Sequence, residues 1–216
     1  MRPVLCMVTA GQLVASSKAD AFTQEVQAAA RAGAHLIQIR EHGLEAGHLT
    51  RVVQSCVEAV AGTRARVIVN DRLDVALAAR AHGVHLRETS IPSRDAREIC
   101  PPQFLIGRSV HTVEDAKRLG RDGCLDYLIF GPVFPTPLKP GVQAVGLQAL
   151  GLAVQATTVP VLAIGGVDAS TAREVGAAGA AGLAAIRWWA ASSQETLTNA
   201  AQDVADAFAV GVASRR

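Results

Sequence analysis

The sequence predicts a single domain folded as a (β/α)8 barrel, a TIM barrel in the α/β class. Three observations predict it: eight short aliphatic runs, helical patterns between them, and a repeat of about 27 residues over a chain of 216. Continuous Val, Ile, Leu and Ala runs are typical of strands buried on both faces, as in a parallel sheet covered by helices. A doubly wound open sheet uses the same alternation and is the alternative.

The eight aliphatic runs mark the expected strands. The first is too short for a signal peptide, which also needs a small-residue cleavage site. Between the second and third runs, apolar residues recur at the spacing of a helix that buries one face. The expected strands are residues 4–9, 35–40, 67–70, 83–86, 104–108, 127–131, 161–164 and 182–186. The apolar stripe comprises Leu49, Val52, Val53, Cys56, Val57 and Val60.

Local signals mark where several helices begin and end. Gly33 is expected to end the first helix in the left-handed conformation. Thr112 with Asp115, and Ser192 with Glu195, have the spacing of a capping box, and Asp168 directly precedes another helical stretch. Residues after about 210 are expected to be disordered, so the domain spans residues 1–216 without an internal linker.

Composition excludes several classes of protein. Half of the residues are hydrophobic, so the chain is not disordered, and no apolar run reaches the length of a membrane helix. The 21 basic and 19 acidic residues form no long run of one sign, which argues against a nucleic-acid partner. The four cysteines form no C-x-x-C pair and are expected to be free thiols in a reducing cytoplasm. Self-association is left open.

Functional residues of such a barrel lie at the carboxyl ends of its strands. Gln38 and Arg40 end the second strand and point the same way, and Asn70 and Asp71 end the third. Asp71 either caps the next helix or holds a metal. Ser109 and His111 follow the fifth strand, and a loop rich in Pro and Gly, residues 131–141, follows the sixth.

The last two strands lead into an expected phosphate site. Gly165 and Gly166 precede a helix after the seventh strand, where barrels bind phosphate through backbone N–H groups, although they could form a plain turn. Ile186 and Arg187 end the eighth strand, and Arg187 is either a site residue or a surface charge. Trp188 and Trp189 are expected to pack in the core, with closure of the pocket or a subunit contact as alternatives.

His111 is the candidate acid–base residue. It lies past the end of a strand, beside Ser109 and directly before the helix-capping Thr112. A helix N-terminus disfavours imidazolium, so a neutral imidazole there can accept a proton near neutral pH. The other histidines that the strands and helices position, His35, His48, His82 and His85, are expected to be structural or solvated.

Six ordered blocks of sequence resemble the thiamine phosphate synthase/thiazole tautomerase (TenI) family, and the resemblance runs from the second strand to the eighth. It implies a (β/α)8 barrel, in agreement with the strand pattern. The blocks are residues 38–41 (QIRE), 69–76 (VNDRLDVA), 83–86 (GVHL), 106–111 (IGRSVH), 126–139 and 163–167 (AIGGV).

The resemblance implies one of two activities. The synthase joins a pyrimidine diphosphate to a thiazole phosphate with Mg²⁺, which requires acidic ligands and cationic partners. In the synthase pattern a Lys follows Arg40 by two places, an Asp follows His85 and Leu86, and a Thr precedes the loop Lys. This chain has His42, Ser90 and Leu138 at those positions. It retains Arg40, Asn70, Asp71, Ser109, Thr136 and Lys139.

These departures favour the tautomerase, an isomerase that aromatises a phosphorylated 2-carboxy-thiazole. The resemblance maps its catalytic histidine onto His111. Arg40 is expected to receive the carboxylate, with Gln38 and Ser109 orienting the ring. No cofactor is then expected, and Mg²⁺ on Asp71 only in a synthase. The expected substrate-binding residues are Gln38, Arg40, Asn70, Ser109, Thr136 and Lys139, and the phosphate-binding residues are Gly165, Gly166, Ile186 and Arg187. The Mg²⁺-dependent synthase and a non-catalytic barrel that binds thiamine-related ligands are the alternatives.

Overall fold

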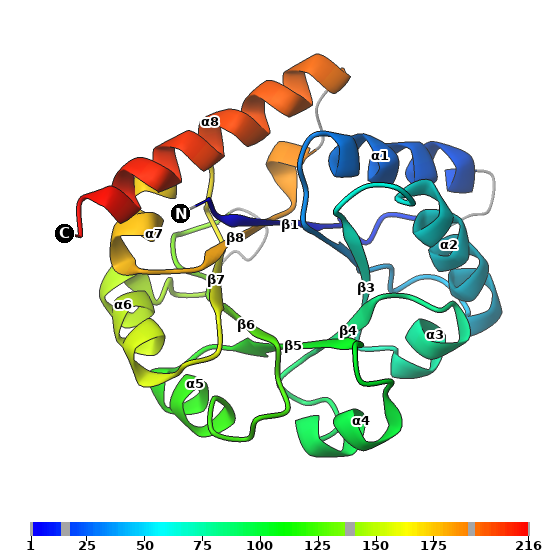
Figure 1. Cartoon of the computed structure of the whole chain (residues 1–216), viewed down its shortest axis with the longest axis horizontal. Helices are drawn as coiled ribbons and strands as arrows, with labels where there is room; N and C mark the ends of the chain where they lie inside the picture. Colours follow the sequence, from blue (N-terminus) through cyan, green and yellow to red (C-terminus); the bar gives the residue numbers. More distant parts are fainter. Residues whose placement is uncertain (1, 14–17, 137–140, 190–192, 216) are drawn as a thin grey trace.

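A computed structural model describes residues 2–13, 18–136, 141–189 and 193–215. Its strands form a closed barrel in chain order, with β8 pairing β1, and every pair is parallel. Figure 1 shows the ring of strands surrounded by helices. The predicted (β/α)8 barrel is therefore confirmed. The strands are β1 (Val4–Val8), β2 (Leu36–Ile39), β3 (Arg66–Asn70), β4 (Gly83–Leu86), β5 (Leu105–Val110), β6 (Tyr127–Phe130), β7 (Val161–Ile164) and β8 (Gly182–Ala185).

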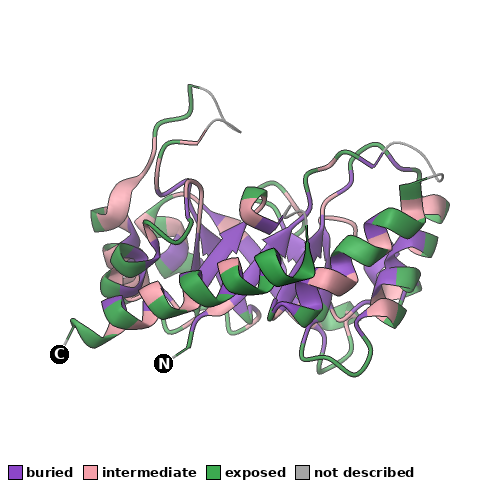
Figure 2. Cartoon of the chain, turned by 90° about the horizontal axis from the view of Figure 1, so that it is seen from above, coloured by how far each residue is buried: buried purple, intermediate pink, exposed green. Residues whose placement is uncertain are grey.

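The helices cover the outside of the barrel. Figure 2 shows buried strands inside and a helix surface that is largely exposed. Within the described residues, no helix is both long and apolar enough to cross a membrane. The helices are α1 (Ala19–Arg31), α2 (Ala46–Ala59), α3 (Leu73–Ala78), α4 (Ser93–Ile99), α5 (Val113–Leu119), α6 (Gly146–Ala156), α7 (Ala172–Ala178) and α8 (Gln194–Ala213), with a 3-10 turn, η2 (Arg187–Trp189), before α8.

Strand residues divide between two apolar clusters because successive side chains point to opposite faces. In β1, Cys6 and Val8 join the small cluster inside the barrel, whereas Leu5 and Met7 join the large cluster beneath the helices. Both faces are thus buried, which explains the absence of polar alternation in the sequence.

Several element boundaries differ from those predicted. β5 runs two residues further, to Val110, because Ser109 and Val110 pair with Ile129 and Phe130 of β6. Thr112 caps α5 as predicted, accepting a hydrogen bond from Asp115 N at 3.1 Å. The cap of α8 is Ser193, one residue later than predicted, and Ser192 lies outside the described residues.

Three further expectations had different outcomes. Gly33 follows α1 with φ +104°, as expected of a left-handed residue. α7 begins at Ala172, because Asp168 forms a separate turn in which its carboxylate accepts from Ser170 N at 2.9 Å. α8 continues to Ala213 instead of ending near residue 210, since Gly211 packs so closely on α7 that a Cβ there would lie 1.8 Å from Arg173 O.

Candidate functional site

The carboxyl ends of β6, β7 and β8 enclose a cavity of about 270 Å³, which we call the glycine cavity. Its lining includes all four residues that the sequence predicts to bind phosphate: Gly165, Gly166, Ile186 and Arg187. Thr136 and Asp168 line it as well, and the Asp168 carboxylate already accepts from the backbone N and hydroxyl of Ser170. The structure therefore brings the predicted phosphate residues into one concave site.

Gly165 and Gly166 are required by the path of the backbone. Their φ angles are +93° and +63°, in the left-handed region that residues with a Cβ rarely adopt. A Cβ on Gly165 would lie 2.5 Å from Pro132 Cβ, and one on Gly166 would lie 2.6 Å from Phe134 Cβ. The loop after β6 lies against these glycines, with Phe134 N donating to Gly165 O at 3.0 Å.

The two tryptophans after β8 have different environments. Trp189 is buried in the large core cluster, as predicted. Trp188 is half-buried, stacks on Trp189 with ring centroids 4.0 Å apart, and lines the glycine cavity beside Arg187. Trp188 thus both packs on the core and forms part of the cavity wall.

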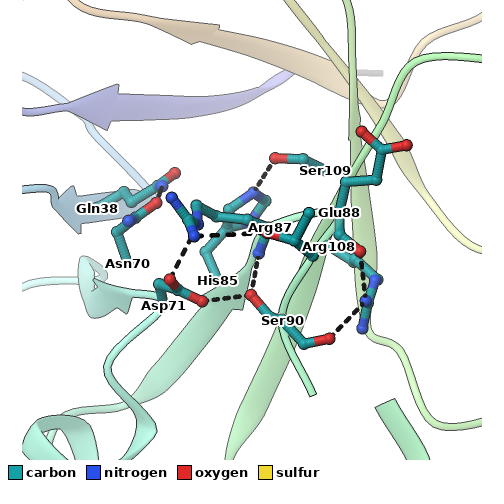
Figure 3. A network of polar contacts seen from close by, with 10 residues as sticks. Gln38, Asn70, Asp71, His85, Arg87, Glu88, Ser90, Arg108 and Ser109 are labelled. Atoms are coloured by element: carbon teal, nitrogen blue, oxygen red, sulfur yellow. Dashed lines mark hydrogen bonds and ion pairs between the residues drawn. The ribbon is translucent and has the colours of Figure 1, made fainter. Parts of the chain in front are cut away.

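The ends of β2 to β5 carry a second region, which we call the polar cluster: Gln38, Asn70, Asp71, His85 and Ser109 (Figure 3). Gln38 Nε2 donates to Asn70 Oδ1 at 2.9 Å. The other oxygen of this amide, Gln38 Oε1, is buried and has no hydrogen-bond partner among the described residues. A buried acceptor of this kind favours a ligand that supplies an N–H or O–H donor.

His85 fixes Ser109 from inside the barrel. Its Nε2 lies 2.8 Å from Ser109 Oγ and its Nδ1 lies 3.2 Å from the Tyr127 hydroxyl. Burial lowers the pKa of His85 to about 3, assisted by the Arg108 cation. The imidazole is therefore neutral at physiological pH, and one ring nitrogen donates while the other accepts.

Asp71 has a partner on each carboxylate oxygen. Oδ1 accepts a short hydrogen bond from Ser90 Oγ, and Oδ2 lies 2.9 Å from Arg87 Nε. Its backbone is left-handed, with φ +64°, and its N–H donates to His85 O at 2.8 Å, which ties the end of β3 to β4. The prediction that Asp71 merely caps α3 is not met, because the N-cap of α3 is Arg72 and no side chain caps it.

Arg108 holds the loop that carries Arg87 and Ser90. It is only 7% exposed and donates to the carbonyls of Ile91, Glu88 and Ser90 at 2.8, 3.0 and 3.2 Å. Burial lowers the pKa of its guanidinium from the usual 12.5. This side chain therefore positions the β4–α4 loop at the rim of the barrel.

Arg40 and its neighbour Glu41 organise the start of the chain at the same rim. Arg40 is half-buried and lies beside Gly11, and its backbone N donates to Thr9 Oγ1 at 2.8 Å. The buried Glu41 carboxylate accepts from Thr9 Oγ1, Gly11 N and Leu13 N at 2.6, 3.2 and 2.8 Å. Glu41 thus holds the loop after β1 against β2.

His111 contacts the loop that follows β6. Its Nδ1 donates to Gly131 O, and the side chain lines a shallow recess with residues of α5 and α6, among them Val113 and Ala149. This contact ties β5 to the loop after β6. The expected acid–base role of His111 stays a prediction, and the contact observed at Nδ1 is with the loop after β6.

The remaining predicted positions divide into described and undescribed residues. His42 is exposed beside Gly11, whereas Leu138 and Lys139 lie outside the described residues. A two-carboxylate magnesium site does not fit the polar cluster, because the partners of Asp71 are a hydroxyl and a guanidinium. In the part of the chain that the structure describes, no three His, Cys, Asp or Glu side chains are grouped to hold a metal ion.

Sequence reasoning missed His85, Arg87 and Arg108 as site residues. His35 and His82 are structural as predicted, each accepting at Nδ1 from a strand backbone N–H at 3.2 and 3.0 Å. His85 differs because it lies within β4 on the inner face, two positions after Gly83. Arg108 sits in a buried strand, and a charge at such a position is itself a signal of a partner.

Comparison with known proteins identifies the relatives of this chain. A thiamine-phosphate synthase of Methanocella arvoryzae is 44% identical over 172 residues, 79% of this chain and 80% of that protein. One from Methanoculleus marisnigri is 40% identical over 90% of this chain and 91% of that protein. The structure of thiamine phosphate pyrophosphorylase from Pyrococcus furiosus superposes with a TM-score of 0.80 at 30% identity, covering 96% of each chain.

These relatives show that the predicted tautomerase, and the isomerase class with it, is wrong: they are named synthases, which are transferases. The prediction treated His42, Ser90 and Leu138 as lost metal and diphosphate contacts of a synthase. It overlooked Arg87, which compensates the charge of Asp71 directly. The model of the family described as "Thiamine monophosphate synthase" matches residues 5–188, and the chain belongs to that family.

Proposed function

We propose that this protein is a thiamine-phosphate synthase, which joins a pyrimidine diphosphate to a thiazole phosphate. The observation that carries the proposal is the presence of two candidate anion sites at one barrel rim: the glycine cavity, and the polar cluster with Arg87 beside it. An enzyme with one phosphorylated substrate needs a single anion site, whereas the synthase must hold two. The high identity to named synthases supports the same activity.

The thiazole phosphate is assigned to the glycine cavity. Backbone N–H groups around Gly165, Gly166 and Ile186 are suited to phosphate oxygens, because a close approach of the backbone needs no side chain in the way. Arg187 adds a cation at the cavity wall, and Thr136 adds a hydroxyl. Asp168 is in the same lining, and its Oδ1 accepts from both the backbone N and the hydroxyl of Ser170.

The pyrimidine diphosphate is assigned to the ends of β2 to β5. Gln38, Asn70 and Ser109 supply neutral donors and acceptors for the ring, and the unpaired Gln38 Oε1 is suited to an amino group. Arg40 and Lys139 are proposed as cationic partners of the diphosphate. The conditional expectation of Mg²⁺ on Asp71 belongs to this region, where the family pattern has a second carboxylate and this chain has Ser90.

The reaction requires orientation and charge stabilisation. A ring nitrogen of the thiazole attacks the exocyclic carbon of the pyrimidine, a C–N bond forms, and the C–O bond to the diphosphate breaks. The diphosphate leaves with the bonding electron pair, so cationic donors that stabilise its growing charge lower the barrier. No proton transfer is needed in this step, so the proposal assigns no role to His111, whose Nδ1 donates to Gly131 O.

The test is formation of thiamine phosphate by the purified protein. Pyrimidine diphosphate and thiazole phosphate are supplied with Mg²⁺, and thiamine phosphate and released pyrophosphate are measured by chromatography and mass spectrometry. We expect the two products in equal amounts. The proposal is overturned if neither product forms, and most clearly if the same protein aromatises the 2-carboxy-thiazole phosphate instead.

A further inference from the structure

At the ends of β3 and β4, one carboxylate and one guanidinium form an ion pair. Asp71 and Arg87 form an ion pair of 2.9 Å, and their side chains are 29% and 54% exposed. Figure 3 shows the Arg87 side chain turning back from the β4–α4 loop toward Asp71. Arg87 directly follows β4, so its guanidinium lies at the rim where the strands end and where solvent and ligands can reach it.

The Ser90 hydroxyl acts as both an acceptor and a donor beside this ion pair. Its hydroxyl accepts from Arg87 N at 2.7 Å and donates to Asp71 Oδ1. A carboxylate at position 90 would instead face the carboxylate of Asp71, and two such groups at this range need a cation between them. The hydroxyl and the guanidinium together satisfy Asp71 within the protein itself.

The negative charge of Asp71 is neutralised here by a guanidinium, whereas in a metal site it would be neutralised by the metal ion. Two carboxylates with one divalent cation carry no net charge, and one carboxylate with one guanidinium carries none either. Glu88 does not supply a second carboxylate for a metal site with Asp71, because its side chain points away from Asp71 in Figure 3. The loop is also held in place, since Arg108 donates to the carbonyls of Glu88 and Ser90.

Some N–H groups of the Arg87 guanidinium remain for an anion. Its Nε faces Asp71, and one terminal nitrogen makes a 3.4 Å contact with Thr89 Oγ1, which leaves the remaining N–H groups of the planar fork. Arginine forks match phosphate oxygens in a two-point geometry that a point charge lacks. Asp71 thus orients a guanidinium that can bind a diphosphate directly.

We propose that Arg87, held by Asp71 and Ser90, binds the diphosphate of the pyrimidine substrate in the electrostatic place of a divalent cation. The proposal rests on the synthase function proposed above. It implies that this chain binds diphosphate, and releases pyrophosphate from it, with little dependence on Mg²⁺.

The first experiment measures binding of inorganic pyrophosphate to the protein by calorimetry in excess chelator. We expect the wild type to bind and Arg87→Gln to bind about 10-fold more weakly or worse. Arg118→Gln is the matched control, because it removes an arginine from an exposed 2.7 Å pair with Asp115 on α5. Thermal unfolding of each variant checks that the fold is kept. Equal pyrophosphate affinity in wild type and Arg87→Gln, or binding that requires added Mg²⁺, overturns the proposal.

The second experiment measures thiamine phosphate formation with chelator and with Mg²⁺. We expect the wild-type rate to change less than about threefold between the two conditions, and Arg87→Ala/Ser90→Asp to gain about tenfold or more from Mg²⁺. A wild type that works only with Mg²⁺ refutes the role of Arg87 and leaves the synthase function standing. If no condition yields thiamine phosphate, the synthase function fails, and the pyrophosphate measurement still decides whether Arg87 is an anion site.

Discussion

The two halves of the barrel rim to which we assign the two anions are built in different ways. At β6 to β8, the glycine cavity offers backbone groups whose position is fixed by Gly165 and Gly166. At β2 to β5, the polar cluster and the β4–α4 loop offer side chains, and Arg87 and Ser90 from that loop each contact the Asp71 carboxylate. A backbone site depends on the path of the chain, whereas a side-chain site depends on which charges are present.

This difference explains how each half varies. No other residue fits at Gly166 without moving the loop after β6, so that half tolerates little change. In the polar cluster, the family pattern's carboxylate is replaced by Ser90 while Arg87 supplies a positive charge next to it. A substitution that removes one charge therefore need not remove the activity if a neighbour restores the balance.

The largest expected effect is in the glycine cavity, where the backbone is proposed to bind the phosphate. Gly166→Ala should lower kcat/KM for thiazole phosphate roughly 10- to 100-fold, because a left-handed alanine with a contact of 2.6 Å to Phe134 is strained. Gly123→Ala is the control, since Gly123 has φ +65° and open space around its Cβ position. Steady-state kinetics with both substrates checks this. A Gly166→Ala enzyme no worse than Gly123→Ala would refute the close-packed cavity.

The next effect concerns the support beneath the polar cluster. Arg108→Gln should lower kcat/KM for the pyrimidine diphosphate about tenfold, because the carbonyls of Glu88, Ser90 and Ile91 lose a charged donor. Arg97→Gln removes similar hydrogen bonds, to the carbonyls of Phe104 and Cys124, at the opposite end of the barrel. If both variants lose stability equally but neither changes the kinetics, the β4–α4 loop does not position the diphosphate.

The pH dependence of stability tests whether His85 is a buried neutral ring in the polar cluster. Its folded pKa of about 3 lies below the usual 6.5, so the unfolded chain binds one more proton between these values. Stability should therefore fall as pH drops from 6.5 toward 3, by about 1.4 kcal/mol per pH unit from this group. Urea unfolding between pH 4 and 6.5 should show a shallower slope for His85→Gln, while His35 and His82 contribute in both proteins. An unchanged slope would mean that His85 is not buried as a neutral ring.

Most of the fold could be predicted from the sequence, because the barrel buries both faces of each strand. β4 and β7 have the predicted bounds, since their runs of apolar residues end where pairing ends. β5 was predicted too short because Ser109 is polar, although its backbone still pairs with Ile129. Backbone pairing is indifferent to side-chain polarity, and this is why strand ends at a functional rim are hard to place.

The candidate site was only partly predictable for a related reason. The carboxyl-end rule located Gly165, Gly166 and Arg187 in one cavity, and Gln38 beside Asn70. It also selected His111, whose ring donates to Gly131 O, a contact that the sequence does not predict. Contacts between loops, such as Asp71 with Arg87, depend on tertiary distance, which spacing along the chain does not contain.

The smallest expected effect asks whether the backbone half also uses a side-chain charge. Arg187 lines the glycine cavity and is exposed, so solvent screens its interaction with a phosphate. Arg187→Ser should weaken binding of thiazole phosphate about fivefold, because the backbone donors remain and only one exposed charge is lost. Arg173→Ser removes an equal charge from exposed α7 and reports the general field alone. Calorimetric titration of each variant at low and high salt checks this. If Arg187→Ser binds like Arg173→Ser, backbone geometry accounts for recognition in this half, and the contrast with the charge-dependent polar cluster becomes sharper.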